Sequence, residues 1–116
     1  YKIHTNAIKH NLIPITLTKE QINYIYSEEA DVLNMALFGK TAKEWRKDNP
    51  ELKGNIRDYA SINELICLVN LENLNSIYIN EGLNQSIRLE RLNKLAISQM
   101  QILNDHDINL LENKYE

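Results

Sequence analysis

Few side chains in this sequence combine the types and spacing that catalysis or metal binding requires. The triplet DHD at 105–107 joins an imidazole to two carboxylates, but adjacent residues on a helix or strand point to different sides. The acidic residues Glu28, Glu29 and Asp31 follow Ser27, where negative charge favours the start of a helix. The sequence contains no phosphate-binding loop, dinucleotide fingerprint or HExxH motif. We therefore expect no enzymatic activity, no metal site and no cofactor.

The single cysteine and the three histidines are also poorly placed for chemistry. Cys67 lies in the apolar run LICLVNL, so we interpret it as a buried structural thiol rather than a nucleophile. One cysteine cannot form an internal disulfide and fits a reducing compartment, which predicts a cytoplasmic protein. The histidines His4, His10 and His106 lie near the two ends of the chain, where exposed or locally bonded imidazoles are expected.

Positive charge gathers in one segment of a chain that is acidic elsewhere. The 116 residues carry a formal net charge of -3, the wrong sign for a free-standing nucleic-acid binder. Residues 40–57 nevertheless hold six basic side chains against three acidic ones. Five of these basic residues are candidates for contacting an acidic partner or a nucleic-acid backbone: Lys43, Arg46, Lys47, Lys53 and Arg57. In the alternative interpretation the segment is only a connector, with Arg57 and Asp58 forming a local ion pair.

The same segment holds two candidate structural anchors. The only tryptophan, Trp45, lies in the short helix AKEWRKD, and its indole would dock that helix onto a helical hairpin. Thr41 and Glu44 have capping-box spacing at the start of this helix, and the following Asn-Pro would end it. Tyr59 is the second candidate anchor, at the end of a connector with turn chemistry.

Helix signals recur along the chain, whereas strand signals are nearly absent. A short helix over 1–13 would end at the following proline. A second helical segment runs from the capping box of Thr18 and Gln21 to Gly39, and the sequence around Ser27 is compatible with a break.

The strongest helix signals lie in the C-terminal half. Ser61 and Glu64 start a helix that ends near Gly82, and Asn84 caps a second long helix. The inward stripe predicted for the first helix is Ile62, Leu65, Ile66, Val69, Leu74, Ile77 and Tyr78. The inward residues predicted for the second are Leu89, Leu92, Leu95, Ala96, Met100 and Leu103. Those predicted to face water are Arg88, Glu90, Arg91 and Lys94. The residues left over for a partner are Leu68, Leu71 and Ile79.

These signals predict one all-α domain over 1–116, a compact bundle of about five helices built on an antiparallel helical hairpin. The hairpin would span 61–103, with a frayed or weakly packed tail over 104–116. Because the chain starts at Tyr1, within a helical pattern and without an initiator methionine, we expect a fragment of a longer protein. No apolar run is long enough for a membrane span, so no membrane partner is expected.

Three blocks of the sequence resemble a known family. They are HTNAIKHNLIP, SEEADVLNMALFGKTAKEWRKDNPELKGNIRDYAS and LVNLENLNSIYINEGLNQSIRLERLNKLAISQM. They are similar to the region that follows the KilA-N domain in bacterial and phage KilA-N proteins. The resemblance covers roughly residues 2–103, and FGKTAKEWR and KGNIRDYA are its most specific parts. In that family the KilA-N domain is a DNA-binding module on the N-terminal side, and nothing in this sequence resembles that module.

The resemblance implies a C-terminal helical domain of a phage- or prophage-type DNA-binding protein, without catalytic residues. Our leading hypothesis is a non-enzymatic interaction domain that self-associates as a dimer or binds a protein partner, with DNA bound through the absent upstream module. The alternative is an auxiliary nucleic-acid-binding domain that uses residues 40–57. A metal-dependent hydrolase would require Glu28, Asp31 and histidines to converge. No small-molecule substrate is indicated.

Overall fold

The computed structural model describes the backbone of residues 13–115 and the side chains of residues 13–106. All regular structure in this part of the chain is helical, which confirms the predicted all-α class. The elements are α2 (Lys19–Asn23), α3 (Glu29–Phe38), α4 (Ala42–Asp48), the 3-10 helix η1 (Ile56–Tyr59), α5 (Ile62–Asn80) and α6 (Gln85–Tyr115). The short helix predicted over 1–13 falls on residues outside the described part, which begins at Ile13.

Short-range capping bonds set where the helices begin. Capping boxes start α2, α4 and α5, as the sequence predicts: a hydroxyl accepts from the N3 amide, and the N3 side chain accepts from the N-cap amide. The pairs are Thr18–Gln21, Thr41–Glu44 and Ser61–Glu64. A fourth box, formed by Asn55 and Asp58, starts η1 in the segment expected to be only a turn. The helical segment before Gly39 is broken into α2 and α3 by residues 24–28.

Two glycines end helices because their backbones enter the left-handed region that favours glycine. Gly39 ends α3 with φ of +70°, and Gly82 follows α5 with φ of +79°. After α5, the Gly82 amide donates to the Ile79 carbonyl at 3.0 Å and the Leu83 amide donates to the Tyr78 carbonyl at 3.1 Å. This is a Schellman motif, which satisfies the last carbonyls of α5 and turns the chain towards α6.

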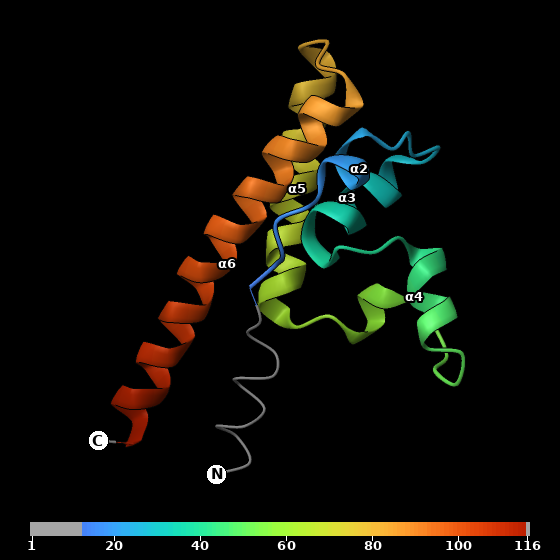
Figure 1. Ribbon diagram of the computed structural model, residues 1–116. Coiled ribbons are helices and arrows are strands. Elements are labelled where there is room, and N and C mark those ends of the chain that lie inside the picture. Colours follow the sequence, from blue (N-terminus) through green and yellow to red (C-terminus); the bar gives the residue numbers. More distant parts are fainter. Residues whose placement is uncertain (1–12, 116) are drawn as a thin grey trace.

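The two long helices α5 and α6 lie side by side and support the shorter elements (Figure 1). Hydrogen bonds join Asn75 to Arg88 close to the connecting turn and Asn63 to Asn104 far from it. Residues close to the turn on one helix thus pair with residues close to the turn on the other, and distant residues pair with distant ones. This pattern indicates two helices that run in opposite directions. α6 remains helical to Tyr115, so the helix continues through most of the segment expected to be a tail.

The hydrophobic core lies between α3, α5 and α6. Its fully buried side chains are Val32, Ala36, Cys67, Leu71, Leu89, Leu92, Ala96 and Met100. The inward residues predicted for α6 belong to this core or pack against it. α4 lies apart and contacts η1 (Figure 1).

The orientation predicted for α5 is wrong for five of its seven stripe residues. Exposed to solvent are Ile62, Leu65, Ile66, Val69 and Ile77. Leu68 and Leu71, predicted to be left over for a partner, are instead buried, whereas Ile79 is exposed. The reason is that α5 is apolar on both sides, so either side has the period of a core stripe. The side that contains Leu71 is the one against which α3 and α6 pack.

On α6, Arg88 also differs in orientation from the prediction. Its side chain is only 8% exposed, whereas Glu90, Arg91 and Lys94 face solvent as expected. Arg88 lies one helical turn before the fully buried Leu92, which puts it on the core side of α6.

Candidate functional site

The five basic candidates are distributed over three elements. Lys43, Arg46 and Lys47 are exposed on α4, and their i, i+3, i+4 spacing gives them one shared face. Lys53 is exposed in the loop after α4, and Arg57 is half-buried on η1. The structure therefore brings three of the candidates together.

The ion pair considered for the connector is absent among the described residues. Asp58 instead accepts a hydrogen bond from the Asn55 amide at 2.8 Å, as part of the cap of η1. Arg57 Nε donates to Asn34 Oδ1 at 3.4 Å, which links η1 to α3. Arg57 is thus held in a structural contact rather than free for a partner.

The two aromatic anchor candidates contact each other. Trp45 is buried, and its ring centroid lies 5.3 Å from that of Tyr59. Tyr59 is half-exposed, and its hydroxyl donates to the Lys53 carbonyl at 2.7 Å. Trp45 therefore docks α4 against η1.

The remaining chemical candidates are separated from one another. Cys67 is fully buried, and burial, together with the negative charge of Glu64, raises the pKa of its thiol to about 11. His106 is exposed on α6, and the other two histidines lie outside the described residues. Within residues 13–106, no group of three or more His, Cys, Asp or Glu side chains could hold a metal ion.

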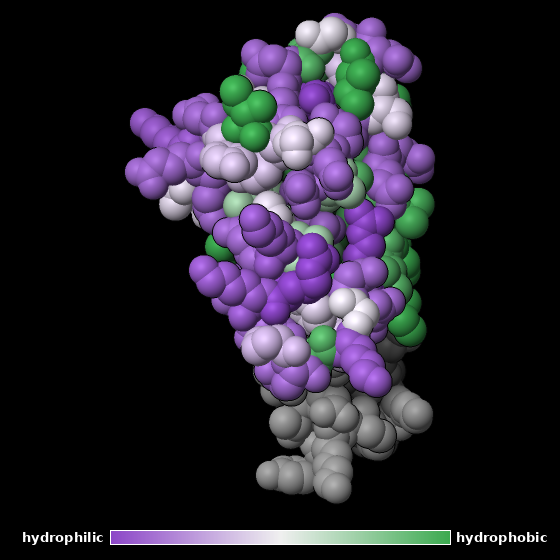
Figure 2. Space-filling view, turned by 90° about the vertical axis from the view of Figure 1, so that its right-hand side faces the viewer, coloured by the Kyte–Doolittle hydropathy of each residue, from purple (hydrophilic) through white to green (hydrophobic). Residues whose placement is uncertain are grey.

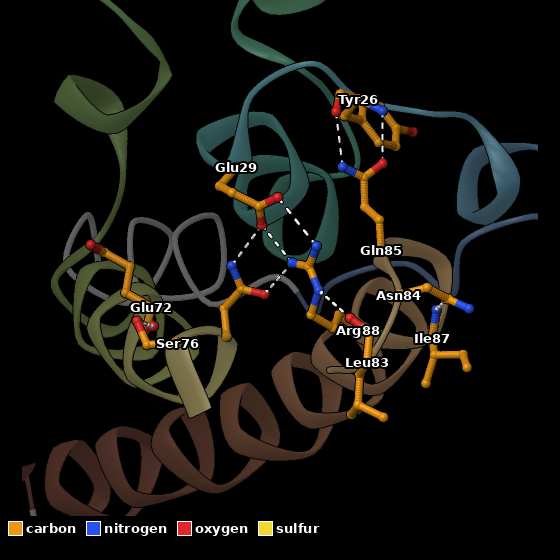
Figure 3. A network of polar contacts seen from close by, with 10 residues as sticks. Tyr26, Glu29, Glu72, Ser76, Leu83, Asn84, Gln85, Ile87 and Arg88 are labelled. Atoms are coloured by element: carbon orange, nitrogen blue, oxygen red, sulfur yellow. Dashed lines mark hydrogen bonds and ion pairs between the residues drawn. The ribbon is translucent and has the colours of Figure 1, made fainter. Parts of the chain in front are cut away.

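The predicted acidic cluster contributes one member to a polar network between three helices (Figure 3). Arg88 on α6 donates to both carboxylate oxygens of Glu29 at the start of α3, at 2.5 and 3.2 Å. It also donates to Asn75 on α5 at 2.7 Å and to the Leu83 carbonyl at 3.1 Å. Asn75 in turn donates to Glu29 at 2.9 Å. Because these groups bond to one another, the network joins the three helices.

A second contact beside this network ties the α2–α3 linker to α6. The Gln85 carboxamide accepts from the Tyr26 amide and donates to the Tyr26 carbonyl, both at 2.8 Å (Figure 3).

These contacts and the burial around them shift the pKa values of two side chains. Hydrogen bonding from Arg88, opposed by partial burial, holds the pKa of Glu29 below its ordinary value of 4.5. Burial raises the pKa of Tyr26 above its ordinary value of 10.0.

A third polar clamp holds the first described residues on α6. Asn93 is 2% exposed, and its amide nitrogen donates to the carbonyls of Ile15 at 2.9 Å and Ala36 at 3.0 Å. Its oxygen accepts from the Leu17 amide at 3.1 Å. Asn93 thus satisfies three backbone groups, and like Arg88 it has a structural role that the sequence did not reveal.

The side of α5 that faces away from the core exposes apolar side chains that do not contribute to the core. We define the outer face of α5 by the exposed, uncharged residues within about 60° of the direction of Ile62, which leaves out Ile79: Ile62, Leu65, Ile66, Val69, Asn73, Ser76, Ile77 and Asn80. Four of them form the 62–69 cluster, with exposed fractions of 77% for Ile62, 40% for Leu65, 44% for Ile66 and 56% for Val69.

Charge is nearly absent from this helix. Within residues 62–80 the only charged side chains are Glu64 and Glu72, and α5 contains no lysine or arginine. At 100° per residue, Glu64 projects towards the core side, and Glu72 lies at the edge of the outer face. In Figure 2, hydrophilic atoms cover the middle of the view, and hydrophobic atoms gather in a band along its right-hand edge.

Comparisons with known proteins leave the function to be inferred from these surfaces. No protein-family model, curated protein or solved structure matches this chain. Among the described residues, no helix is long and apolar enough to cross a membrane.

Proposed function

We propose that this chain is a non-enzymatic interaction domain that associates with another protein surface, chiefly a second copy of itself, through the outer face of α5. The observation that carries the proposal is the exposure of the 62–69 cluster on a face without charge. Removing apolar surface from water is favourable by about 25 cal/mol per Å². A partner that covers this cluster would therefore gain free energy without desolvating a charge.

Other helices of the same molecule show how unusual the outer face is. The solvent side of a surface helix is ordinarily charged or polar. α4 exposes Lys43 and Arg46, and α6 exposes Glu90 and Lys94, although α6 also exposes Ile87 and Ile102, which lie far apart in sequence. The outer face of α5 departs from that rule over its first two turns, and contiguous exposed apolar surface of this kind is typical of interaction sites.

The resemblance to the region after KilA-N domains supplies a context for such an interaction. We propose that the domain belongs to a phage- or prophage-type DNA-binding protein whose upstream module contacts DNA. Joining two chains would hold two such modules at a high effective concentration along one DNA molecule. A weak contact between the helical domains would then be sufficient to strengthen DNA binding.

Concentration-dependent mass measurement tests the proposal directly. Light scattering on the purified chain, up to about 1 mM, should show a mass that rises from monomer towards dimer. Ile66→Asp should keep the mass at the monomer, because two carboxylates would be buried against apolar partners. Ile25→Asp is the matched control, since Ile25 is 86% exposed on a different segment, and it should associate like the parent chain. A parent chain that remains monomeric, with a mass unchanged by Ile66→Asp, would refute self-association.

The basic side of α4 supports a second candidate function, direct contact with nucleic acid. Lys43, Arg46 and Lys47 are exposed and form no ion pair with the described residues, whereas Lys40 pairs with Asp48 at 2.8 Å. Fluorescence anisotropy with duplex and single-stranded DNA at low salt should show binding that weakens steeply as salt increases. Replacing the three free basic residues with alanine should abolish that binding. No change in anisotropy for the parent chain at low salt would eliminate this function.

A further inference from the structure

We infer that the partner of the outer face is the same face of a second copy, packed antiparallel about a two-fold axis that passes between Leu65 and Ile66. This inference rests on the proposed function and adds the identity, direction and register of the partner.

The spacing of the 62–69 cluster is the first reason. Its positions are separated by three, one and three residues, so the pattern is identical when read in either direction. In an antiparallel pair centred on the middle of the cluster, Ile62 lies opposite Val69 of the partner subunit, and Leu65 lies opposite Ile66 of the partner subunit. All four exposed apolar side chains of each copy are then buried against the four of the other, as an isologous contact requires.

Charge is the second reason for choosing a second copy. The chain is net negative, so most of its surface would repel an identical surface. The 62–69 cluster carries no charge, Glu72 is the only charged side chain at the edge of the outer face of α5, and the amide and hydroxyl groups of this face can both donate and accept hydrogen bonds. The cluster can therefore meet its own copy without like-charge repulsion.

Electrostatics also distinguishes the antiparallel from the parallel arrangement. The basic segment 40–57 leads into the N-terminus of α5, which is the positive end of the helix dipole. A parallel pair would place two such segments and two positive helix ends at the same level. An antiparallel pair moves them to opposite sides of the two-fold axis and places the helix dipoles in opposition.

The size of the cluster determines how strong the association can be. Seven residues of helix separate Ile62 from Val69, a length of about 10 Å at 1.5 Å per residue. Four partly exposed side chains over this length offer much less surface than the roughly 800 Å² per partner of a standard stable interface. The dimer of this domain alone is therefore weak and reversible.

Cysteine pairing can determine the direction and the register. The variants Ile62→Cys and Val69→Cys are mixed at high concentration in a glutathione redox buffer, and disulfides are identified by mass spectrometry. With equal amounts of the two variants, random pairing gives the 62–62, 62–69 and 69–69 disulfides in a ratio of about 1:2:1, and the antiparallel arrangement predicts the mixed 62–69 disulfide in excess of that ratio. The reason is that two copies of residue 62 would lie about 10 Å apart along the axis, beyond the roughly 7 Å Cα separation that a disulfide tolerates. Cys67 should not interfere, because it is fully buried and its thiol pKa is raised to about 11.

Matched controls separate failure of this inference from failure of the proposed function. A mixture of Ile62→Cys and Ile77→Cys should give no excess of mixed disulfide, since residue 77 lies outside the cluster. An excess there would overturn the register, and preferential 62–62 and 69–69 disulfides would overturn the antiparallel direction. In both cases the dimer detected by light scattering, and with it the proposed function, would stand.

The stability of Ile66→Asp tests whether the cluster is covered by its own chain instead. Because Ile66 is exposed in the monomer, the substitution should change the melting temperature of a dilute sample very little. A large fall in that temperature, with a monomeric parent chain, would show that the face is already occupied within one chain, and would overturn the inference.

Discussion

The two faces of α5 have similar apolar content but opposite environments. The inner face buries Cys67, Leu68 and Leu71, and the outer face exposes Ile62 and Val69. The polar side chains of the inner face also form hydrogen bonds with α3 and α6: Asn75 donates to Glu29 and accepts from Arg88, and Asn63 donates to Asn104. The difference shows that apolar content does not identify the core side of a helix. The core side is the one where the neighbouring helices supply both apolar contacts and partners for polar groups.

The largest effect on stability should follow from truncating the inner face. Leu71→Ala removes a fully buried side chain from the contact of α5 with the core and should lower the free energy of unfolding by about 3 kcal/mol. Urea denaturation followed by circular dichroism measures this change. A loss below about 1 kcal/mol would mean that the inner face repacks around the cavity.

A smaller loss should follow from removing the charged residue that joins the inner face to its neighbours. Arg88→Ala removes the donor to the Asn75 oxygen and to the Leu83 carbonyl and leaves Glu29 with its bond from Asn75 but without those from Arg88, and we expect a loss of about 2 kcal/mol. Water can reach Glu29, whose side chain is 44% exposed, and this limits the cost. Arg91→Ala is the control, because Arg91 is exposed and lies over the Tyr78 ring at 5.6 Å. Equal unfolding curves for the two variants would contradict the network's role.

The same network should make stability depend on pH. The pKa of Glu29 is lower in the folded protein than its ordinary value of 4.5, because Arg88 hydrogen bonds to the ionised form. This stabilisation is therefore present above about pH 4.5 and is lost as the pH falls through the folded pKa. Glu29→Gln should lower the free energy of unfolding near neutral pH. The difference in unfolding free energy between the variant and the parent should shrink below about pH 4.5. Parallel stability profiles from pH 7 to about pH 3 would show that the ionised form of Glu29 is not specifically stabilised.

The smallest effect on stability should come from the outer face. Ile62→Ser replaces a side chain that is 77% exposed and should change the unfolding free energy of the monomer by no more than about 0.5 kcal/mol. The same substitution should weaken association in light scattering. Leu68→Ser, on the buried side of the same helix, should instead destabilise the monomer strongly. Similar losses for both would mean that the two faces are equally buried.

The sequence predicted the features that depend on interactions within a few residues. The capping boxes at Thr18, Thr41 and Ser61, and the glycine at the end of α3, were all correctly predicted, because each is a local bond or a local backbone preference. The box at Asn55 has the same chemistry, but the short 3-10 helix that follows gave no periodic signal.

The features that depend on distant contacts were not predictable in the same way. Both sides of α5 carry apolar residues at helical spacing, so periodicity alone could not choose between Leu71 and Val69 as the core residue. The candidate site was therefore mistaken for core. Arg88 and Asn93 were also missed, because their partners on α3 and in the N-terminal segment lie more than fifty residues away in sequence. The available signal was their position on the core side of α6. Arg88 lies one turn before Leu92, and Asn93 lies one turn before Ala96 and Ile97.

The contact between Gln85 and Tyr26 has a consequence for local opening of the fold. Tyr26 lies in a linker without regular helix, yet its amide and carbonyl are both bonded by one side chain of α6. Its amide proton is consequently protected from exchange with solvent deuterium as long as the first turn of α6 is closed. Tyr26 should therefore exchange in step with the start of α6 and much more slowly than the amides beside it, which makes one linker proton a reporter of how often the α2–α3 linker separates from the first turn of α6.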